Sequence, residues 1–149
     1  MPVPAALDEQ TLWLMQQVWE LVHALDVRSK QMERTLGVTG PQRLVIRAVG
    51  RSPNATAKEI AQTLGLHPST LTGVLSRLET RGMLERRDDA NDGRRRRFRL
   101  TARGRVIDRQ REGTVEAAVS RSIQRGNASM LQMTGRMLAL LVTELERAD

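Results

Sequence analysis

The sequence contains no cysteine and few aromatic residues, and both shortages restrict what the protein can do. Without thiols there is no disulfide framework, no thiolate metal site and no thiol-based redox sensor. With Trp13, Trp19 and Phe98 as its aromatics, the chain offers no stacking platform for single-stranded nucleic acid. No apolar run approaches the ~18 residues of a spanning helix, and the N-terminus lacks the features of a secretory signal peptide. We therefore expect a cytoplasmic protein with no membrane partner.

The residue sets of common enzymes are also missing. There is no glycine-rich phosphate loop and no plausible set of nucleophile, base and orienting residue. Glu20 and His23 share one helical face, which makes half of a metal site, and no cysteine can complete it. His67 precedes Pro68 at a helix start, where a cap or a phosphate contact fits better than catalysis. We expect no enzymatic activity, no metal and no cofactor.

Positive charge is concentrated in one stretch of the chain. The formal net charge is +7, and the segment 86–111 holds eleven arginines against four acidic residues. This segment therefore carries the whole surplus, and the rest of the chain is neutral. A localised basic patch indicates a polyanionic partner. Nucleic acid is the main candidate, with acidic lipid or protein surfaces as alternatives.

Helical periodicity organises the first half of the chain. Apolar residues at steps of three and four predict a long amphipathic helix over 7–36, ended by Gly37. A short helix follows, with Thr39 or Gly40 as its cap and Pro41 in its first turn, running to about Val49. Its expected inward residues are Leu44, Val45, Ala48 and Val49.

Two further short helices form a helix-turn-helix pattern. The sequence TAKE at 56–59 is a capping box, in which Thr56 and Glu59 satisfy each other's backbone amides. That helix ends at Gly65, and HPSTLTGVLSRLETRG then predicts a second helix that begins at Pro68 and stops at Gly82. Two helices joined by a tight turn that contains glycine are typical of this DNA-binding motif.

A β-hairpin and two long helices follow. MLERR and RRFRL bracket the polar stretch DDANDGR and predict two strands, with Leu84, Phe98 and Leu100 on one face. Thr101 caps a long helix that we expect over 102–125. Gly126 and Asn127 break it, and a last helix runs to the C-terminus.

Together these elements predict a mainly α-helical fold with a small β-hairpin wing. The expected architecture is a winged helix-turn-helix at 41–101, within a single domain of 1–149. Long helices at 7–36 and 102–148 flank it. They carry more apolar surface than a winged domain can cover, so we expect them to pair with a second copy and form a homodimer.

Three stretches resemble the MarR family of bacterial transcriptional regulators, and the likeness covers nearly the whole chain. They are EIAQTLGL, LHPSTLTGVLSRLETRGMLERR, and a wing pattern formed by Asp92, Arg94, Phe98, Leu100 and Thr101. The resemblance implies a homodimeric repressor that binds a pseudo-palindromic operator in double-stranded DNA and is released by a small ligand.

The resemblance also implies roles for individual residues. It assigns Arg94 to the minor groove, with Asp92 orienting it. Because side chains alternate along a strand, Arg94, Arg95, Arg96 and Arg97 cannot all face DNA, so some should reach phosphates and one should stay solvated. Base readout falls to the second helix of the motif. The residues assigned to it are Ser69, Thr70, Thr72, Ser76 and Arg77, with Arg77 the best candidate for a guanine or a phosphate. Gly73 lies among them and is counted as a further DNA-binding residue.

Gly73 departs from the family, which more often has a larger, commonly basic residue there. Glycine inside a helix costs about 1 kcal/mol relative to alanine. Close approach to DNA and drift at a tolerant surface position both remain open as explanations.

A pocket for a small aromatic or cationic effector is a further implication of the resemblance. It would lie where the dimer helices meet the winged domain. Its candidate lining residues are Trp13, Gln17, His23, Arg43 and Arg47, and ordinary packing or surface charge competes with this interpretation at each of them.

Three hypotheses for the function follow. The first is a dimeric, sequence-specific DNA-binding transcriptional regulator, which we favour. The second is a winged-helix module whose wing binds an acidic protein. The third is a nonspecific, nucleoid-associated DNA-binding protein. Competition with unrelated DNA separates the first from the third.

Overall fold

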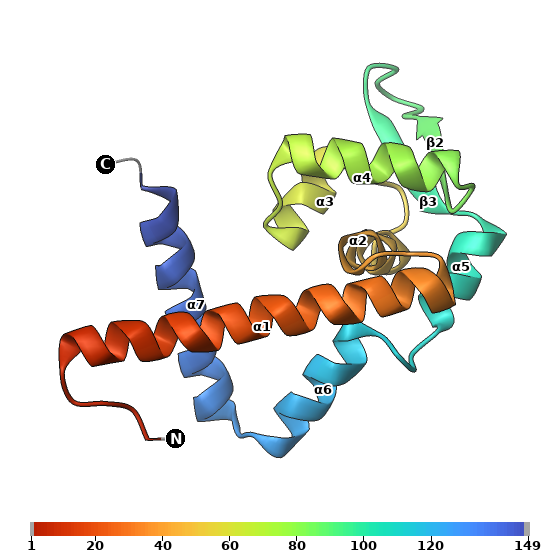
Figure 1. Cartoon of the computed structure of the whole chain (residues 1–149). Helices are drawn as coiled ribbons and strands as arrows, with labels where there is room; N and C mark the ends of the chain where they lie inside the picture. Colours follow the sequence, from red (N-terminus) through yellow and green to blue (C-terminus); the bar gives the residue numbers. More distant parts are fainter. Residues whose placement is uncertain (1, 148–149) are drawn as a thin grey trace. The chain divides into compact units, whose positions relative to one another are not determined.

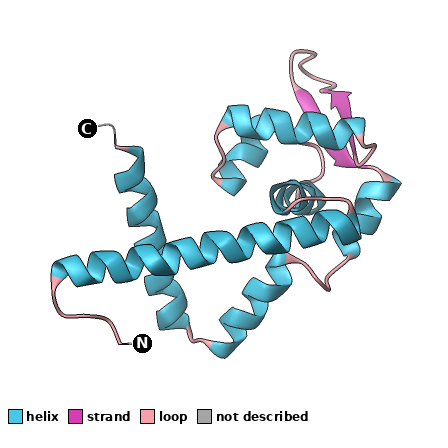
Figure 2. Cartoon of the chain, in the orientation of Figure 1, coloured by secondary structure: helices cyan, strands magenta, loops and turns pink. Residues whose placement is uncertain are grey.

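The computed structural model describes residues 2–147, which form a mainly helical fold with one small sheet (Figures 1 and 2). The fold class predicted from the sequence is confirmed. Contacts divide the chain into two compact units, one up to Val115 and one from Glu116 onward. The elements in chain order are α1 (Leu7–Leu36), α2 (Gly40–Arg51), β1 (Ala55–Thr56), α3 (Ala57–Leu64), α4 (Pro68–Thr80), β2 (Leu84–Asp88), β3 (Arg96–Leu100), α5 (Ala102–Arg109), α6 (Val115–Arg125) and α7 (Ala128–Glu146).

Local signals end and start the first helices where the sequence predicts. Gly37 closes α1 in the left-handed conformation, with φ of 72°, which glycine adopts without steric cost. The Thr39 side chain accepts from the Gln42 backbone amide and caps α2. The Gln42 side-chain oxygen in turn accepts from the Thr39 amide. At the start of α3 the Thr56 amide donates to Glu59 Oε2 at 2.7 Å, which completes the predicted capping box.

The core of the first unit surrounds α2, which packs against α1, α3, α4, α5 and β3. Val45, Ile46 and Val49 of α2 are completely buried. They contact buried residues of α4 such as Leu71 in one continuous apolar cluster. Leu44 is a wrong prediction, because 46% of it is exposed. It lies on the outer face of α2, between the buried residues Arg43 and Val45.

The wing is an antiparallel sheet of three strands in the order β1-β3-β2. Leu84 pairs with Leu100, and Arg86 pairs with Phe98. The three apolar side chains predicted to share a face, at 84, 98 and 100, are all buried. The two-residue strand β1 was not predicted, because Ala55–Thr56 is too short for an alternating pattern. It extends the sheet by pairing Ala55 with Phe98.

The helix predicted over 102–125 is wrong as a single element. It stops at Arg109, and α6 begins only at Val115. Gly113 lies between them with φ of 73°. The guanidinium of Arg43, from α2, donates to the backbone carbonyls at the end of α5: to those of Ile107 and Asp108 and, at 2.5 Å, to that of Gln110. These carbonyls are thus satisfied without a further helical turn.

The second unit contains α6 from Glu116 onward and α7, which Asn127 caps by accepting from the Met130 amide at 2.9 Å. Within the described part of this unit, the large apolar side chains of α7 are almost all exposed. The end of the predicted segment 102–148 lies outside the described residues. None of the helices within 2–147 has the length and apolar character needed to cross a bilayer.

Candidate nucleic-acid interface

Helix α4 buries one face and presents a polar face to solvent. Leu71, Val74, Leu75 and Leu78 are buried in the core. Six positions before and between them carry hydroxyl groups, one glycine and one arginine, and all six are exposed: Ser69, Thr70, Thr72, Gly73, Ser76 and Arg77. The structure therefore brings together on one outer surface every α4 residue that was expected to bind DNA.

The side chains on this surface are not equally available. Ser69 Oγ lies 2.7 Å from Nδ1 of His67, and this nitrogen also accepts from the Ser69 amide as the cap of α4. The Thr72 hydroxyl donates back to the Pro68 carbonyl at 2.9 Å. The side chains of Thr70, Ser76 and Arg77 make no hydrogen bond or ion pair with any described residue. These three are the groups of α4 most available for an external partner.

Two aspartates fold the tip of the wing. Asp89 Oδ1 accepts from the Asn91 amide at 2.9 Å, and Asp92 Oδ1 accepts from the Arg94 amide at 3.1 Å. These are two successive Asx turns, in which a short carboxylate side chain replaces a backbone acceptor. The Asp89 amide donates to the Arg95 carbonyl at 3.0 Å and closes the loop. In Figure 1 the tip projects beyond the helices near α4.

The four consecutive arginines have different environments. The guanidinium of Arg95 pairs with Asp92 at 3.2 Å, that of Arg96 pairs with Asp88, and that of Arg97 pairs with Asp89 at 2.6 Å. Arg94 is exposed, and its guanidinium has no partner among residues 2–147. The structure thus singles out the arginine that the wing pattern assigns to the minor groove.

The role expected for Asp92 needs correction. Its carboxylate orients the backbone of Arg94 and the side chain of Arg95, and it does not contact the guanidinium of Arg94. The physical reason is the turn itself: once Oδ1 accepts the Arg94 amide, Oδ2 faces the guanidinium of the next residue. Asp92 fixes the loop from which Arg94 extends.

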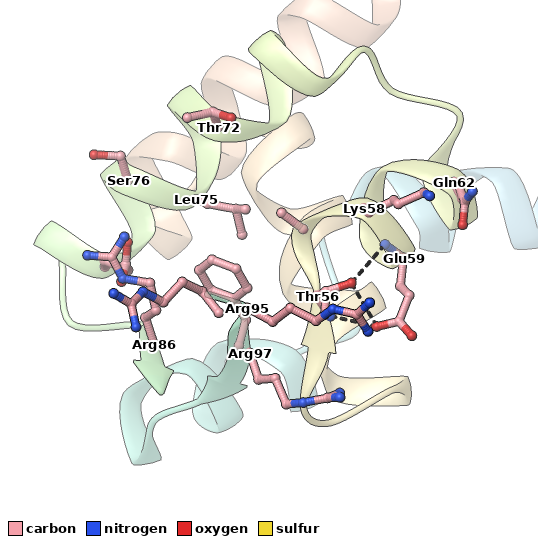
Figure 3. Close-up of a pocket in the computed structure, with 14 residues that line it drawn as sticks. Thr56, Lys58, Glu59, Gln62, Thr72, Leu75, Ser76, Arg86, Arg95 and Arg97 are labelled. Carbon is pink, nitrogen blue, oxygen red and sulfur yellow. Dashed lines mark hydrogen bonds and ion pairs between the residues drawn. The ribbon is translucent and has the colours of Figure 1, made fainter. Parts of the chain in front are cut away.

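A groove of about 890 Å³ separates α4 from the wing and from α3. Figure 3 shows Thr72 and Ser76 of α4 on one side and Lys58 and Gln62 of α3 on the other. Arg86, Arg95, Arg96 and Arg97 line its floor and rim. Glu79 holds the Arg86 guanidinium at 3.3 Å. Basic side chains therefore outnumber the two acidic ones of the lining, Glu59 and Glu79, with hydroxyl groups on the α4 wall and the Gln62 amide on the α3 wall.

Sequence reasoning missed three residues of this groove: Lys58, Gln62 and Arg86. Lys58 is in the first turn of α3, where exposed backbone amides and the helix dipole also favour anions. The capping box that predicted the start of this helix was the available signal for Lys58. No sequence pattern distinguishes Arg86 from the other arginines, because its position depends on the pairing of β2 with β3.

Two carboxylates near the groove have pKa values below those usual for their types. Hydrogen bonds from the Thr56 amide and hydroxyl lower the pKa of Glu59. The Asn91 amide, followed by the side chain of Arg97, lowers the pKa of Asp89. Both acids are committed to local structure, so neither cancels the positive charge of Arg94.

The structure gives two of the candidate ligand residues other roles. Arg43 is 1% exposed and binds the carbonyls at the end of α5. Arg47 Nη1 donates to Asp108 Oδ1 at 2.7 Å. Trp13, Gln17 and His23 lie on α1, where Trp13 is half-buried and the other two are exposed. No group of three possible metal ligands occurs within residues 2–147.

Comparisons with known proteins agree with this geometry. A sequence model described as the MarR family matches residues 36–95, from the end of α1 to the wing tip. The HTH-type transcriptional repressor Rv2887 of Mycobacterium tuberculosis (strain ATCC 25618 / H37Rv) is 33% identical to the chain over 106 residues. This match covers 71% of the chain and 76% of the repressor.

Two solved structures share the fold. PcaV, a transcriptional regulator from Streptomyces coelicolor solved with its natural ligand, covers 98% of both chains with a TM-score of 0.65 and 22% identity. MepR of S. aureus, solved as a DNA complex, covers 90% of this chain and 96% of its own, with a TM-score of 0.70 and 18% identity. The match to Rv2887, together with the family match across helix-turn-helix and wing, shows that this chain belongs to the MarR family of transcriptional regulators.

Proposed function

We propose that the protein is a homodimeric, sequence-specific DNA-binding transcriptional repressor. One observation carries the proposal: side chains without an internal partner occur together on α4 and at the wing tip, on the two sides of a basic groove. Thr70, Ser76 and Arg77 provide donors and acceptors on a helix of a size that fits the major groove. Arg94 provides a guanidinium on a projecting loop, suited to a narrow minor groove with strong negative potential.

The remaining arginines of the wing act on the phosphate backbone or on the wing itself. Arg95 and Arg96 are exposed, and each pairs with one aspartate at the surface, so DNA phosphates can replace these partners at little cost. Arg97 is more enclosed and holds the wing together. Lys58 and Arg86 extend the phosphate-binding surface along the groove.

The homodimer is part of the proposal because both units expose apolar helical faces. On α1, Trp19 is 65% exposed and Leu21 is 47% exposed. On α7, Met133 is 67% exposed and Leu140 is 59% exposed. Exposed apolar surface of this extent marks an interaction site, and two copies with two-fold symmetry would match a pseudo-palindromic operator. The segments 7–36 and 102–148 are thus proposed as dimerisation helices around the winged region at 41–101.

Three similar proteins support the regulatory part. Rv2887 is named a repressor, MepR has been solved with DNA, and PcaV has been solved with its natural ligand. We propose that a small molecule, aromatic or cationic, releases this protein from its operator in the cytoplasm. Trp13, Gln17 and His23 are the proposed contacts. We leave Arg43 and Arg47 out of the proposed contacts because their guanidiniums bind groups of α5 and of the residue after it. The proposal contains no catalytic step.

Selection of bound DNA from a random pool tests this function. We expect enrichment of a two-fold symmetric sequence with half-sites about one helical turn apart, which unrelated DNA does not displace. Enrichment of no sequence would indicate a nonspecific, nucleoid-associated protein. Absence of specific DNA binding, or DNA binding that wing variants do not change, would favour a module whose wing binds an acidic protein.

A further inference from the structure

Gly73 occupies the middle of the exposed face of α4, and nothing inside the protein requires a glycine there. A Cβ added to Gly73 would meet no atom within 4 Å. By contrast, a Cβ on Gly104 would collide with the backbone carbonyl of Met83. Gly73 is also not among the residues with positive φ, unlike Gly37 and Gly65. Glycine therefore weakens α4 relative to alanine without any compensation from packing or conformation.

The surroundings of this position form a shallow bare patch. One helical turn before Gly73 lie Ser69 and Thr70, and one turn after it lie Ser76 and Arg77. All four are exposed. The one acidic residue of α4, Glu79, is half-buried and paired with Arg86. The patch thus exposes backbone and Cα, with donors around it and no carboxylate to repel DNA.

An uncovered backbone on a reading helix fits one group of the major groove in particular. The C5-methyl of thymine is the apolar projection among the hydrogen-bonding edges of the bases. A side chain at this position would hold the helix away from it, whereas glycine leaves room for it. We propose that Gly73 determines specificity by receiving a thymine methyl group in the space that a Cβ would occupy, so that each half-site carries a T·A pair there. This inference rests on the proposed function.

The test combines a protein variant that adds a methyl group at position 73 with an operator that lacks one thymine methyl group. The operator selected from a random pool is prepared with each thymine in turn replaced by 2′-deoxyuridine, which lacks only the methyl group. At one position of each half-site, uracil should lower the operator affinity of the wild-type protein about fourfold, which is the factor for one buried methyl group. Gly73→Ala should bind the thymine operator more weakly. It should recover affinity on the uracil operator at that same position, because the added Cβ takes the place of the missing methyl.

Two controls keep the outcome clear. Gly73→Ala should melt at a higher temperature than wild type, so weak binding cannot come from a misfolded α4. Thr63→Ala places an alanine on α3 at an exposed position outside the groove and outside the proposed dimerisation helices, and its preference for thymine over uracil should equal that of wild type. If no thymine position responds to uracil, or if Gly73→Ala keeps the wild-type preference at every position, the inference is wrong. If the wild-type protein selects no operator at all, the proposed function fails first.

Discussion

Arg97 and Asp89 form the contact that anchors the wing loop to the sheet. Arg97 Nε donates to Asp89 Oδ2 at 2.7 Å, and Nη2 lies 2.6 Å from the same oxygen. Arg97 Nη1 also donates to the carbonyl of Asn54 at 2.8 Å, next to β1. One guanidinium thus ties the start of the wing loop to the opposite edge of the sheet, while Arg94 stays available at the tip.

This difference predicts that Arg97 and Arg94 affect stability differently. Arg97→Ala should lower the melting temperature, because Asp89 keeps a buried carboxylate without its charged partner. Arg94→Ala should leave the melting temperature unchanged, because the Arg94 guanidinium has no partner among the described residues. Thermal unfolding followed by circular dichroism measures both. Equal melting temperatures for the two variants would show that Arg97 is only another surface charge.

The same contact predicts how the wing responds to pH. The pKa of Asp89 is lowered in the folded protein, so its contribution to stability is present above the unfolded value of about 3.9 and is lost as pH falls through the folded value. We expect the contribution of Asp89 to wing stability to be constant from about pH 5 upward and to fall in stronger acid. Amide hydrogen exchange at the wing reports the change. In Asp89→Asn the acid-dependent part should disappear.

DNA flank preference separates groove insertion from phosphate binding. Arg94→Ala should reduce affinity and flatten the preference between A·T-rich and G·C-rich flanks, because groove width and potential depend on sequence. Arg96→Ala should weaken binding to both flanks alike and reduce the salt slope by about one unit. Asp92→Ala should give a milder form of the Arg94→Ala result, since it loosens the turn that presents Arg94. Titrations at several salt concentrations measure these effects, and identical behaviour of Arg94→Ala and Arg96→Ala would refute the assignment.

Arg43 should be essential for the fold and not for an effector. Arg43→Ala leaves carbonyls of Ile107, Asp108 and Gln110 without their charged donor inside the protein, and we expect a loss of roughly 3 kcal/mol or more in the free energy of unfolding. Arg47→Ala, which breaks a half-buried ion pair with Asp108, is the milder comparison. Chemical denaturation measures both variants. An Arg43→Ala protein that is as stable as wild type and has lost only effector binding would show that Arg43 contacts the effector.

The apolar faces of the terminal helices predict a stable dimer. Sedimentation should find a dimer at the concentrations at which the protein binds DNA, and a compact monomer at micromolar concentration would contradict this. Truncation after Gly126 removes α7 with its exposed leucines and should give aggregated or unfolded protein. A soluble monomer from this truncation that still binds DNA would show that α7 is not needed for assembly.

Local signals were sufficient to predict most of the fold. The caps at Thr39, Thr56 and Gly37, the helix-turn-helix and the hairpin depend on residues close together in sequence. The break between α5 and α6 was missed because its cause is distant: the guanidinium of Arg43, more than sixty positions earlier, binds the carbonyls at the end of α5.

The candidate site was predicted in part for the same reason. The exposed face of α4 follows from helical periodicity, and the position of Arg94 follows from the wing pattern. The partners of Arg95, Arg96 and Arg97 depend on loop geometry that no sequence spacing specifies. Strand pairing across the wing, likewise, is what places Arg86 next to Glu79 in the groove.

Competition between the selected operator and a scrambled duplex of equal length and composition tests the central claim most directly. The protein is bound to labelled operator at physiological salt, and each unlabelled duplex is added in increasing amount. Sequence-specific readout by α4 and the wing predicts that the operator competes at least about 10³-fold better than the scrambled duplex. Equal competition by the two duplexes would contradict the account and leave only a basic surface that binds any DNA.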